Sequence, residues 1–315
     1  MSGAVLELTG ALDRQLRKLE LDITRRLDGL LRGQHLGLVP GAGSELDGSR
    51  EYRPGEDDAR LLDWAVTART AVPHVRKTIA DRELTVQVLV DATASMDFGT
   101  ADLEKRQIAA GAVAAVGFLT AGSGNRLGAD VLHADGLRRI PPRAGRAHLM
   151  RVLRTLLEAP RTPPGVRGPG LPEALAQTVR SLRRRGLVVI VSDFLDDLGT
   201  DDAPSRFSWE HELRRLTIRH QVLAVEVLDP RELELPDVGV VTLLDPESGR
   251  RREVSTSNRR LRERYNLAAA EHRRSVAAAL RRSGATHLVL RTDRDWVADI
   301  ARHTRKQRGR TAVAR

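Results

Sequence analysis

The stretch LVDATASMDF, from Leu89 to Phe98, decides how the chain is read, because a strongly apolar run ends there in an aspartate. The run is short, apolar and rich in β-branched residues, as in a strand that is buried on both faces. Asp91 is followed two and four residues later by the hydroxyls of Thr93 and Ser95. Two interpretations are open: a cradle for a divalent cation at a strand end, or an ordinary strand-to-helix turn with an Asx turn and an N-cap.

Strands and helices alternate after this stretch. Between helical segments, apolar strand-like runs recur at residues 126–134, 187–194, 221–229 and 286–292. This alternation predicts right-handed crossovers and an α/β fold built on a doubly wound, mostly parallel sheet. The segment LRRIPPR, residues 137–143, is expected to form a short edge strand that Pro141 and Pro142 end.

The chain divides into three predicted parts. Residues 1–80 contain a helical arm over residues 4–32, with leucines at three- and four-residue spacing, and a long loop rich in Gly, Pro and Asp. Residues 81–305 form the α/β domain, with a hairpin insertion near 238–255 and a last helix capped by Asp293. Residues 306–315 are expected to be a frayed basic tail.

The composition limits the classes of function. The 315 residues are 41 % hydrophobic, enough for a core, and the absence of cysteine excludes disulfides, thiolate metal sites and a cysteine nucleophile. The net charge is +10, but the basic residues are spread along amphipathic stretches, and only four of the 52 are lysines. Nucleic acid is therefore not the expected main partner. No signal-peptide core or run of ~20 apolar residues is present, so a cytoplasmic protein without a membrane span is expected.

A second strand end offers another carboxylate. The buried run LVVIVSDF ends at Asp193, and in doubly wound sheets ligands bind outside the carboxyl ends of the strands. Carboxylate and hydroxyl oxygens suit a hard cation such as Mg²⁺, which usually keeps several waters. If the two strands are close neighbours, Asp91, Thr93, Ser95 and Asp193 supply a partial set of ligands.

The pair DATASM and VVIVSDF resembles the von Willebrand factor A fold with its metal-ion-dependent adhesion site. That motif is Asp-x-Ser-x-Ser, a later Thr, and an Asp after a central strand. The resemblance implies that Asp91, Thr93, Ser95 and Asp193 hold Mg²⁺ or another divalent cation. Pro169 of GPGLPEAL stands where the resemblance implies the Thr, so one hydroxyl ligand is missing, and Thr162 is a distant substitute.

Upstream, the segment GSREYRPGEDDARLLDWAVTART is similar to the segment that marks the DUF58 family, bacterial proteins with a von Willebrand A-like domain. This resemblance covers nearly the whole chain and implies a partner, a MoxR-type AAA+ ATPase. The aromatic rings of Tyr52 and Trp64 are expected to pack the arm onto the α/β core, whereas the charged residues could either pair with one another or form a docking surface. The signature residues are Arg50, Tyr52, Arg53, Gly55, Asp57, Asp63, Trp64, Ala68, Arg69 and Thr70.

Three functions are compatible with these features. The first is a non-enzymatic adaptor with a partly degenerate metal site, which acts with the ATPase in assembly or maturation of other complexes. The second is a metal-independent α/β scaffold that binds partners, acidic or nucleic-acid surfaces included, through its N-terminal segment and basic faces. The third is a metal-dependent hydrolase, which ranks last because neither an activated nucleophile nor a general base is visible near the aspartates.

Overall fold

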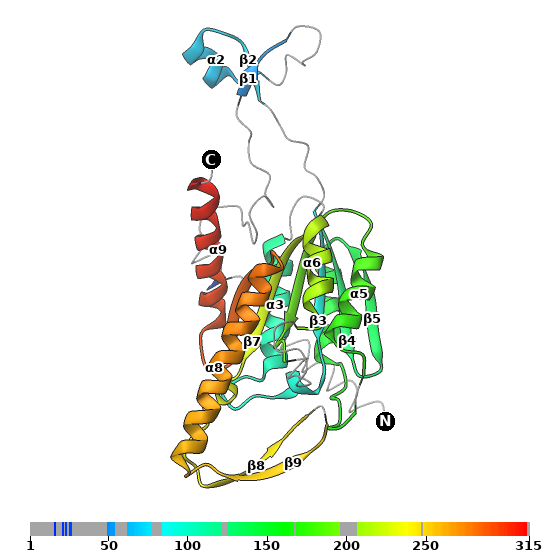
Figure 1. The fold of residues 1–315 in the computed structure, drawn as a ribbon. Coiled ribbons are helices and arrows are strands. Elements are labelled where there is room, and N and C mark those ends of the chain that lie inside the picture. Colours follow the sequence, from blue (N-terminus) through cyan, green and yellow to red (C-terminus); the bar gives the residue numbers. More distant parts are fainter. Residues whose placement is uncertain are drawn as a thin grey trace.

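The structure, a computed structural model, describes residues 16, 21, 23, 25, 26, 49–53, 62–76, 84–120, 125–166, 168–195, 207–246 and 248–313. A six-stranded sheet in the order β10-β7-β6-β3-β4-β5 forms its centre (Figure 1). All neighbouring strands are parallel except β5, which runs antiparallel to β4. The predicted doubly wound, mostly parallel sheet is confirmed. Its strands are β3 Thr85–Asp91, β4 Arg126–His133, β5 Gly136–Arg143, β6 Leu187–Ser192, β7 Gln221–Leu228 and β10 Thr286–Arg291.

Helices cover both faces of the sheet. Alternate side chains of one strand point to opposite faces, so that Val88 and Val90 of β3 enter one core cluster while Leu89 enters the other. The first cluster packs under α3 Lys105–Thr120, α4 Arg146–Leu157 and α9 Trp296–Val313. The second packs under α5 Leu171–Ser181, α6 Glu210–Arg219 and α8 Arg259–Arg282.

The edge strand β5 differs from its prediction. It continues through Pro141 and Pro142 to Arg143 instead of ending at the prolines. Its pairing with β4 shifts register here, with Ile140 opposite Ala129 but Arg143 opposite Leu127. An edge strand tolerates proline because the missing amide hydrogens need not serve a ladder on the outer side, and the irregular register absorbs the rest.

The predicted hairpin is present as β8 Val240–Leu244 and β9 Arg251–Ser255, which pair antiparallel. Figure 1 shows it beyond one end of the sheet. Its turn touches the loop between α4 and α5, where the Gly165 amide donates to the Pro246 carbonyl at 3.0 Å. The hairpin is thus attached at its turn as well as at its base.

The signature segment forms a small unit of its own, beyond the opposite end of the sheet in Figure 1. It consists of β1 Ser49–Glu51, β2 His74–Arg76 and α2 Trp64–Thr70. Asp63 caps α2 through Val66 N and also accepts from the Ser49 hydroxyl at 2.9 Å.

The packing role predicted for Trp64 is wrong. Its side chain is 70 % exposed, because α2 belongs to the small unit and contributes no buried residue. Tyr52, the other predicted anchor, is only half-buried. Gly55 and Asp57 lie outside the described residues. The contact between the arm and the core instead involves Leu16 and Ile23, which are helical and buried in the first core cluster.

Two predictions at the C-terminus also need correction. Helix α9 runs to Val313, so residues 306–313 of the predicted tail are helical. Arg, Lys, Gln and Ala are good helix formers, and they outweigh the concentration of positive charge. The helix is capped by Asp295, which accepts from Ala298 N at 3.1 Å, whereas Asp293 pairs with Arg291.

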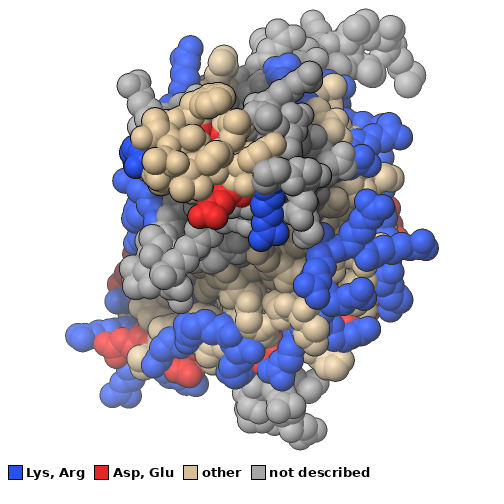
Figure 2. Space-filling view, turned by 90° about the horizontal axis from the view of Figure 1, so that it is seen from above, with Lys and Arg blue, Asp and Glu red and all other residues tan. Residues whose placement is uncertain are grey.

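Charged side chains are exposed at the end of the molecule that carries the small unit (Figure 2). Figure 2 looks onto the end that carries the small unit and shows Lys and Arg side chains around the periphery, with some Asp and Glu among them. Among the described residues no helix is both long and apolar enough to cross a membrane.

Candidate functional site

The candidate site lies where the strand order reverses. From β3 the chain adds β4 and β5 on one side, and then β6, β7 and β10 on the other. The carboxyl ends of β3 and β6, which pair directly, form the switch point at which open α/β sheets bind ligands. Asp91 is the last residue of β3, and Asp193 directly follows β6.

Asp91 accepts three hydrogen bonds in a buried position. Its Oδ1 accepts from the Thr93 amide at 3.0 Å and from the Thr93 hydroxyl at 2.7 Å. Its Oδ2 accepts from the Ser192 hydroxyl at 2.7 Å, across the β3–β6 pair. The Asx turn with Thr93 is therefore present, but Asp91 caps no helix, and Ser192 is a member of the site that the sequence interpretation missed.

The hydroxyls connect the two aspartates. Thr93 Oγ1 and Ser95 Oγ are 3.3 Å apart, and the Ser95 hydroxyl lies near enough to the Asp193 carboxylate to help lower its pKa. The four predicted ligands therefore lie together in one continuous polar cluster. Asp91, Ser95 and Asp193 are all less than a tenth exposed.

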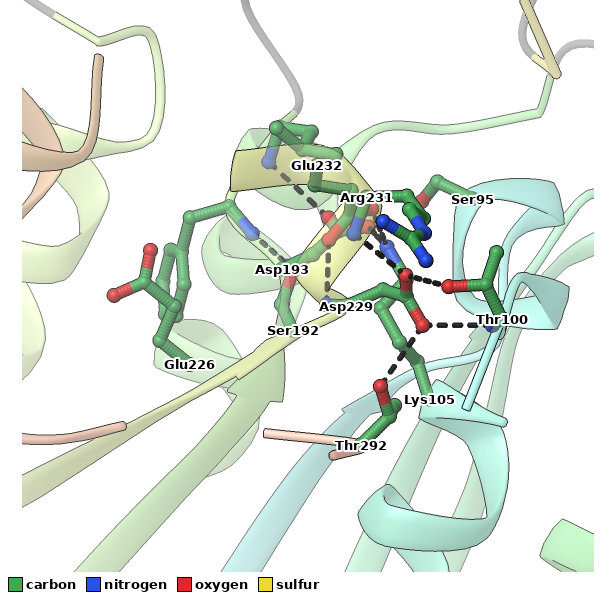
Figure 3. A network of polar contacts seen from close by, with 12 residues as sticks. Ser95, Thr100, Lys105, Ser192, Asp193, Glu226, Asp229, Arg231, Glu232 and Thr292 are labelled. Atoms are coloured by element: carbon green, nitrogen blue, oxygen red, sulfur yellow. Dashed lines mark hydrogen bonds and ion pairs between the residues drawn. The ribbon is translucent and has the colours of Figure 1, made fainter. Parts of the chain in front are cut away.

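A lysine that the sequence interpretation did not single out lies inside this cluster. Lys105, the first residue of α3, is completely buried, and its Nζ donates to Asp193 Oδ2 at 2.7 Å. The same ammonium pairs with Glu232 (Figure 3). The rarity of lysine could have indicated it, because the chain has 48 arginines and only four lysines. A lysine among so many arginines suggests a position that needs a compact charge with three donors.

Glu232 is placed by the cap of the short helix α7 Pro230–Leu233. The Asp229 side chain accepts from Arg231 N at 2.9 Å, and Glu232 Oε2 accepts from Asp229 N at 2.9 Å, which forms a capping box. Asp229 also accepts from Thr100 N and from the Thr292 hydroxyl, both at 2.8 Å. Figure 3 shows this network, which joins the ends of β7 and β10 to the loop before α3.

The cluster holds more carboxyl groups than cations. Burial, together with the charge of Asp193, raises the pKa of Asp91 to about 7. Burial also favours a higher pKa for Asp193, but the charge and hydrogen bond of Lys105 bring that pKa below its ordinary value. Burial raises the pKa of Glu232, although Lys105 acts in the opposite direction. The Lys105 ammonium thus pairs with Asp193 and Glu232, whereas Asp91 forms no ion pair within the described structure.

The donor set of this cluster fits a hard divalent cation. It offers two carboxylates and two hydroxyls, all oxygen ligands, and the negative charge that Lys105 leaves uncompensated would be neutralised by a doubly charged ion. Among the described residues no three acidic or histidine side chains converge as a metal cluster. A cation would therefore depend on the hydroxyls of Thr93 and Ser95 as well as on Asp91 and Asp193.

The loop in which the Thr was expected passes the carboxyl end of β4. A Cβ at Gly168 would lie 2.4 Å from the Ala134 carbonyl oxygen, so this close approach requires glycine. Pro169 follows, half-buried and without a hydroxyl or an amide hydrogen. Thr162 is buried, but its Oγ1 lies 3.3 Å from His133 Nε2. Neither residue has a hydrogen bond to the cluster in the described structure.

The signature residues are not part of this site. Arg50, Tyr52, Arg53, Asp63, Trp64 and Arg69 all belong to the small unit or its edge. That unit and the hairpin lie beyond opposite ends of the sheet (Figure 1). The small unit and the aspartate cluster are therefore two separate candidate binding regions.

Comparisons with known proteins identify relatives in sequence and in fold. Rv1480 of Mycobacterium tuberculosis, an uncharacterized protein, is 52 % identical over 93 % of this chain and 89 % of its own length. In fold the chain is similar to BatB of Bacteroides thetaiotaomicron, at 14 % identity and a TM-score of 0.43 over 73 % of this chain and 99 % of BatB. It is also similar to the VWA domain of SpRpn10, at 12 % identity and a TM-score of 0.36 over 70 % of this chain and 94 % of that domain. Residues 48–275 match the family described as "Protein of unknown function DUF58", and on this match and the identity to Rv1480 the chain belongs to the DUF58 family.

Proposed function

We propose that the protein is a non-enzymatic interaction domain that holds Mg²⁺, or a similar divalent cation, at Asp91, Thr93, Ser95 and Asp193. One observation carries the proposal: the switch point of the sheet buries the carboxyl groups of Asp91 and Asp193 beside two hydroxyls, and the single ammonium there also pairs with the partly buried Glu232. Burying uncompensated charge is costly, and a bound divalent cation supplies positive charge and open coordination positions for an oxygen ligand of a partner. Asp91 and Asp193 would orient and charge-balance such an ion, and Lys105 would keep Asp193 ionised.

The proposed partner is a MoxR-type AAA+ ATPase in the cytoplasm, and the proposed role is assembly or maturation of other complexes. This step rests on what membership of the DUF58 family implies. In the proposal, a carboxylate of the partner completes the coordination at the carboxyl edge of the sheet. Pro169 leaves one protein hydroxyl fewer than the adhesion motif provides, which leaves more of the shell to water or to the partner.

Capture of the ATPase from native lysate, with and without EDTA, tests this proposal. Immobilised wild-type protein is expected to retain a AAA+ ATPase in Mg²⁺ and to lose most of it in EDTA, and Asp91→Ala should lose it under both conditions. Glu271→Gln, a change of an exposed residue on α8, is the matched control and should behave like the wild type. ATPase capture and Mg²⁺-dependent thermal stability that were both unchanged in Asp91→Ala would rule the proposal out.

A metal-independent scaffold is the second candidate, and two observations favour it. Lys105 already gives Asp193 a cationic partner without any metal. The small unit also exposes Trp64, and tryptophan is enriched among the residues that dominate binding energy at interfaces. On this alternative, Trp64→Ala would abolish capture of the partner and EDTA would have no effect, which is the reverse of the pattern expected for the carboxyl-edge site.

A further inference from the structure

A cavity on the edge of the sheet has an unusual lining. It measures about 150 Å³ and lies between β5 and α4. The lining includes Ile140, which is buried in the same core cluster as residues of α4. Thr155 and His148 lie along the α4 side. No acidic residue lines the cavity, whereas four arginines do: Arg138, Arg139, Arg143 and Arg151.

Three of these guanidinium groups are uncompensated. Arg139 is bound to the buried Asp130, with its Nε 2.8 Å from Oδ1, so its charge is already matched. Arg138, Arg143 and Arg151 are exposed, and within the described structure none of them takes part in an ion pair. The charge at the cavity is therefore about +3, held over a confined space in which an anion would make several contacts at once.

From this lining we infer that the cavity is a binding site for a small phosphate-bearing anion. Planar guanidinium forks recognise phosphate oxygens in pairs. A single carboxylate would neutralise one guanidinium and leave two unmatched, whereas a phosphate carries about two negative charges and a pyrophosphate more. A cavity of about 150 Å³ suits one or two phosphoryl groups and is below the roughly 300–1,000 Å³ of pockets for larger ligands.

This site is separate from the aspartate cluster. In the sheet, β4 lies between β3, which carries Asp91, and β5. Within the described structure no hydrogen bond or ion pair joins a residue of the cavity to Asp91, Thr93, Ser95 or Asp193. The inference therefore stands or falls independently of the proposed function.

Isothermal titration of the full chain with inorganic phosphate, pyrophosphate and citrate at low ionic strength tests the assignment. Wild-type protein is expected to bind pyrophosphate saturably and more tightly than citrate. Arg138→Ser/Arg151→Ser is expected to weaken this binding by about tenfold or more, because two charge-assisted contacts are lost. Arg139 is left unchanged, since its loss would leave Asp130 buried without its partner.

The control is Arg184→Ser/Arg264→Ser, which removes the same net charge at exposed positions outside the cavity. It should bind pyrophosphate within about twofold of the wild type, and circular dichroism should show all variants folded. An absence of saturable binding by the wild type, or an equal loss in the control, would overturn the inference. Citrate bound as tightly as pyrophosphate would overturn the assignment to phosphate.

Discussion

Replacing Lys105 with methionine is expected to lower the free energy of unfolding by about 3–5 kcal/mol in EDTA at neutral pH. The lysine is completely buried and pairs with Asp193 and Glu232. Methionine keeps much of its apolar volume but leaves both carboxyls without a cation. Urea denaturation measures the effect, and Lys306→Met, a change of an exposed lysine on α9, is the matched control, expected to stay within about 0.5 kcal/mol of the wild type.

The same variant distinguishes the two proposed modes of action. If a divalent cation binds beside Asp193, millimolar Mg²⁺ should stabilise Lys105→Met more than it stabilises the wild type, because the variant has a larger excess of buried negative charge. A loss of stability that Mg²⁺ does not reduce would favour the metal-independent scaffold. Stability within about 1 kcal/mol of the wild type in EDTA would contradict the buried ion pairs themselves.

Replacing Asp91 with asparagine is expected to raise the free energy of unfolding of the metal-free protein, whereas Lys105→Met lowers it. Asparagine can still accept from Thr93 and face Ser192, but it removes a carboxylate whose ionisation is opposed by burial and by Asp193. The pKa of Asp91 rises from 3.8 unfolded to about 7 folded, and each unit corresponds to about 1.4 kcal/mol. The metal-free variant should therefore be more stable than the wild type by up to about 4 kcal/mol at pH 8, and should no longer respond to Mg²⁺.

The pH dependence of this difference follows from the direction of the pKa shift. Between pH 4 and pH 7 the folded protein holds a proton at Asp91 that the unfolded chain has released, so ionisation of this group costs stability as the pH rises. The difference in unfolding free energy between Asp91→Asn and the wild type should be near zero at pH 4, grow through pH 7 and then level off. Taking the difference removes the contributions of the partly buried histidines with lowered pKa values, which are common to both proteins. A difference independent of pH would show that Asp91 titrates normally.

The strands and the aspartates at their ends could be predicted because both depend on the local sequence. Parallel strands buried on both faces read as continuous apolar runs, and the aspartates that end β3 and β6 interrupt those runs. What could not be read locally was that β3 and β6 are neighbours, since pairing order is a property of the whole sheet. That adjacency brings Asp91 to Ser192 and Asp193.

The charge balance of the site was not predictable for the same reason. Glu232 is 127 residues away from Lys105 in the sequence. It is positioned by the cap of a four-residue helix, which is too short to show a hydrophobic periodicity in the sequence. Lys105 reads as the polar start of an amphipathic helix, although it is completely buried. Only its rarity among arginines distinguished it in the sequence.

Trp64 shows the limit of composition as a guide. This scarce aromatic residue was expected to pack the N-terminal arm onto the α/β core, because burial of a large ring stabilises strongly. The structure places it on a small separate unit with most of its surface exposed. Pro141 and Pro142 were likewise expected to end β5, but the strand continues through both because its pairing with β4 is irregular there.

Calorimetric titration of Mg²⁺ into metal-stripped protein tests the central claim, a cation at the carboxyl ends of β3 and β6, most directly. The account predicts one saturable site in the wild type at pH 8, retained in Glu271→Gln and lost in Asp91→Asn and Asp193→Asn. It also predicts about tenfold weaker binding at pH 6, where Asp91 is mostly protonated and must release its proton. No saturable binding at millimolar Mg²⁺ and pH 8, or equal binding by wild type and both variants, would contradict it.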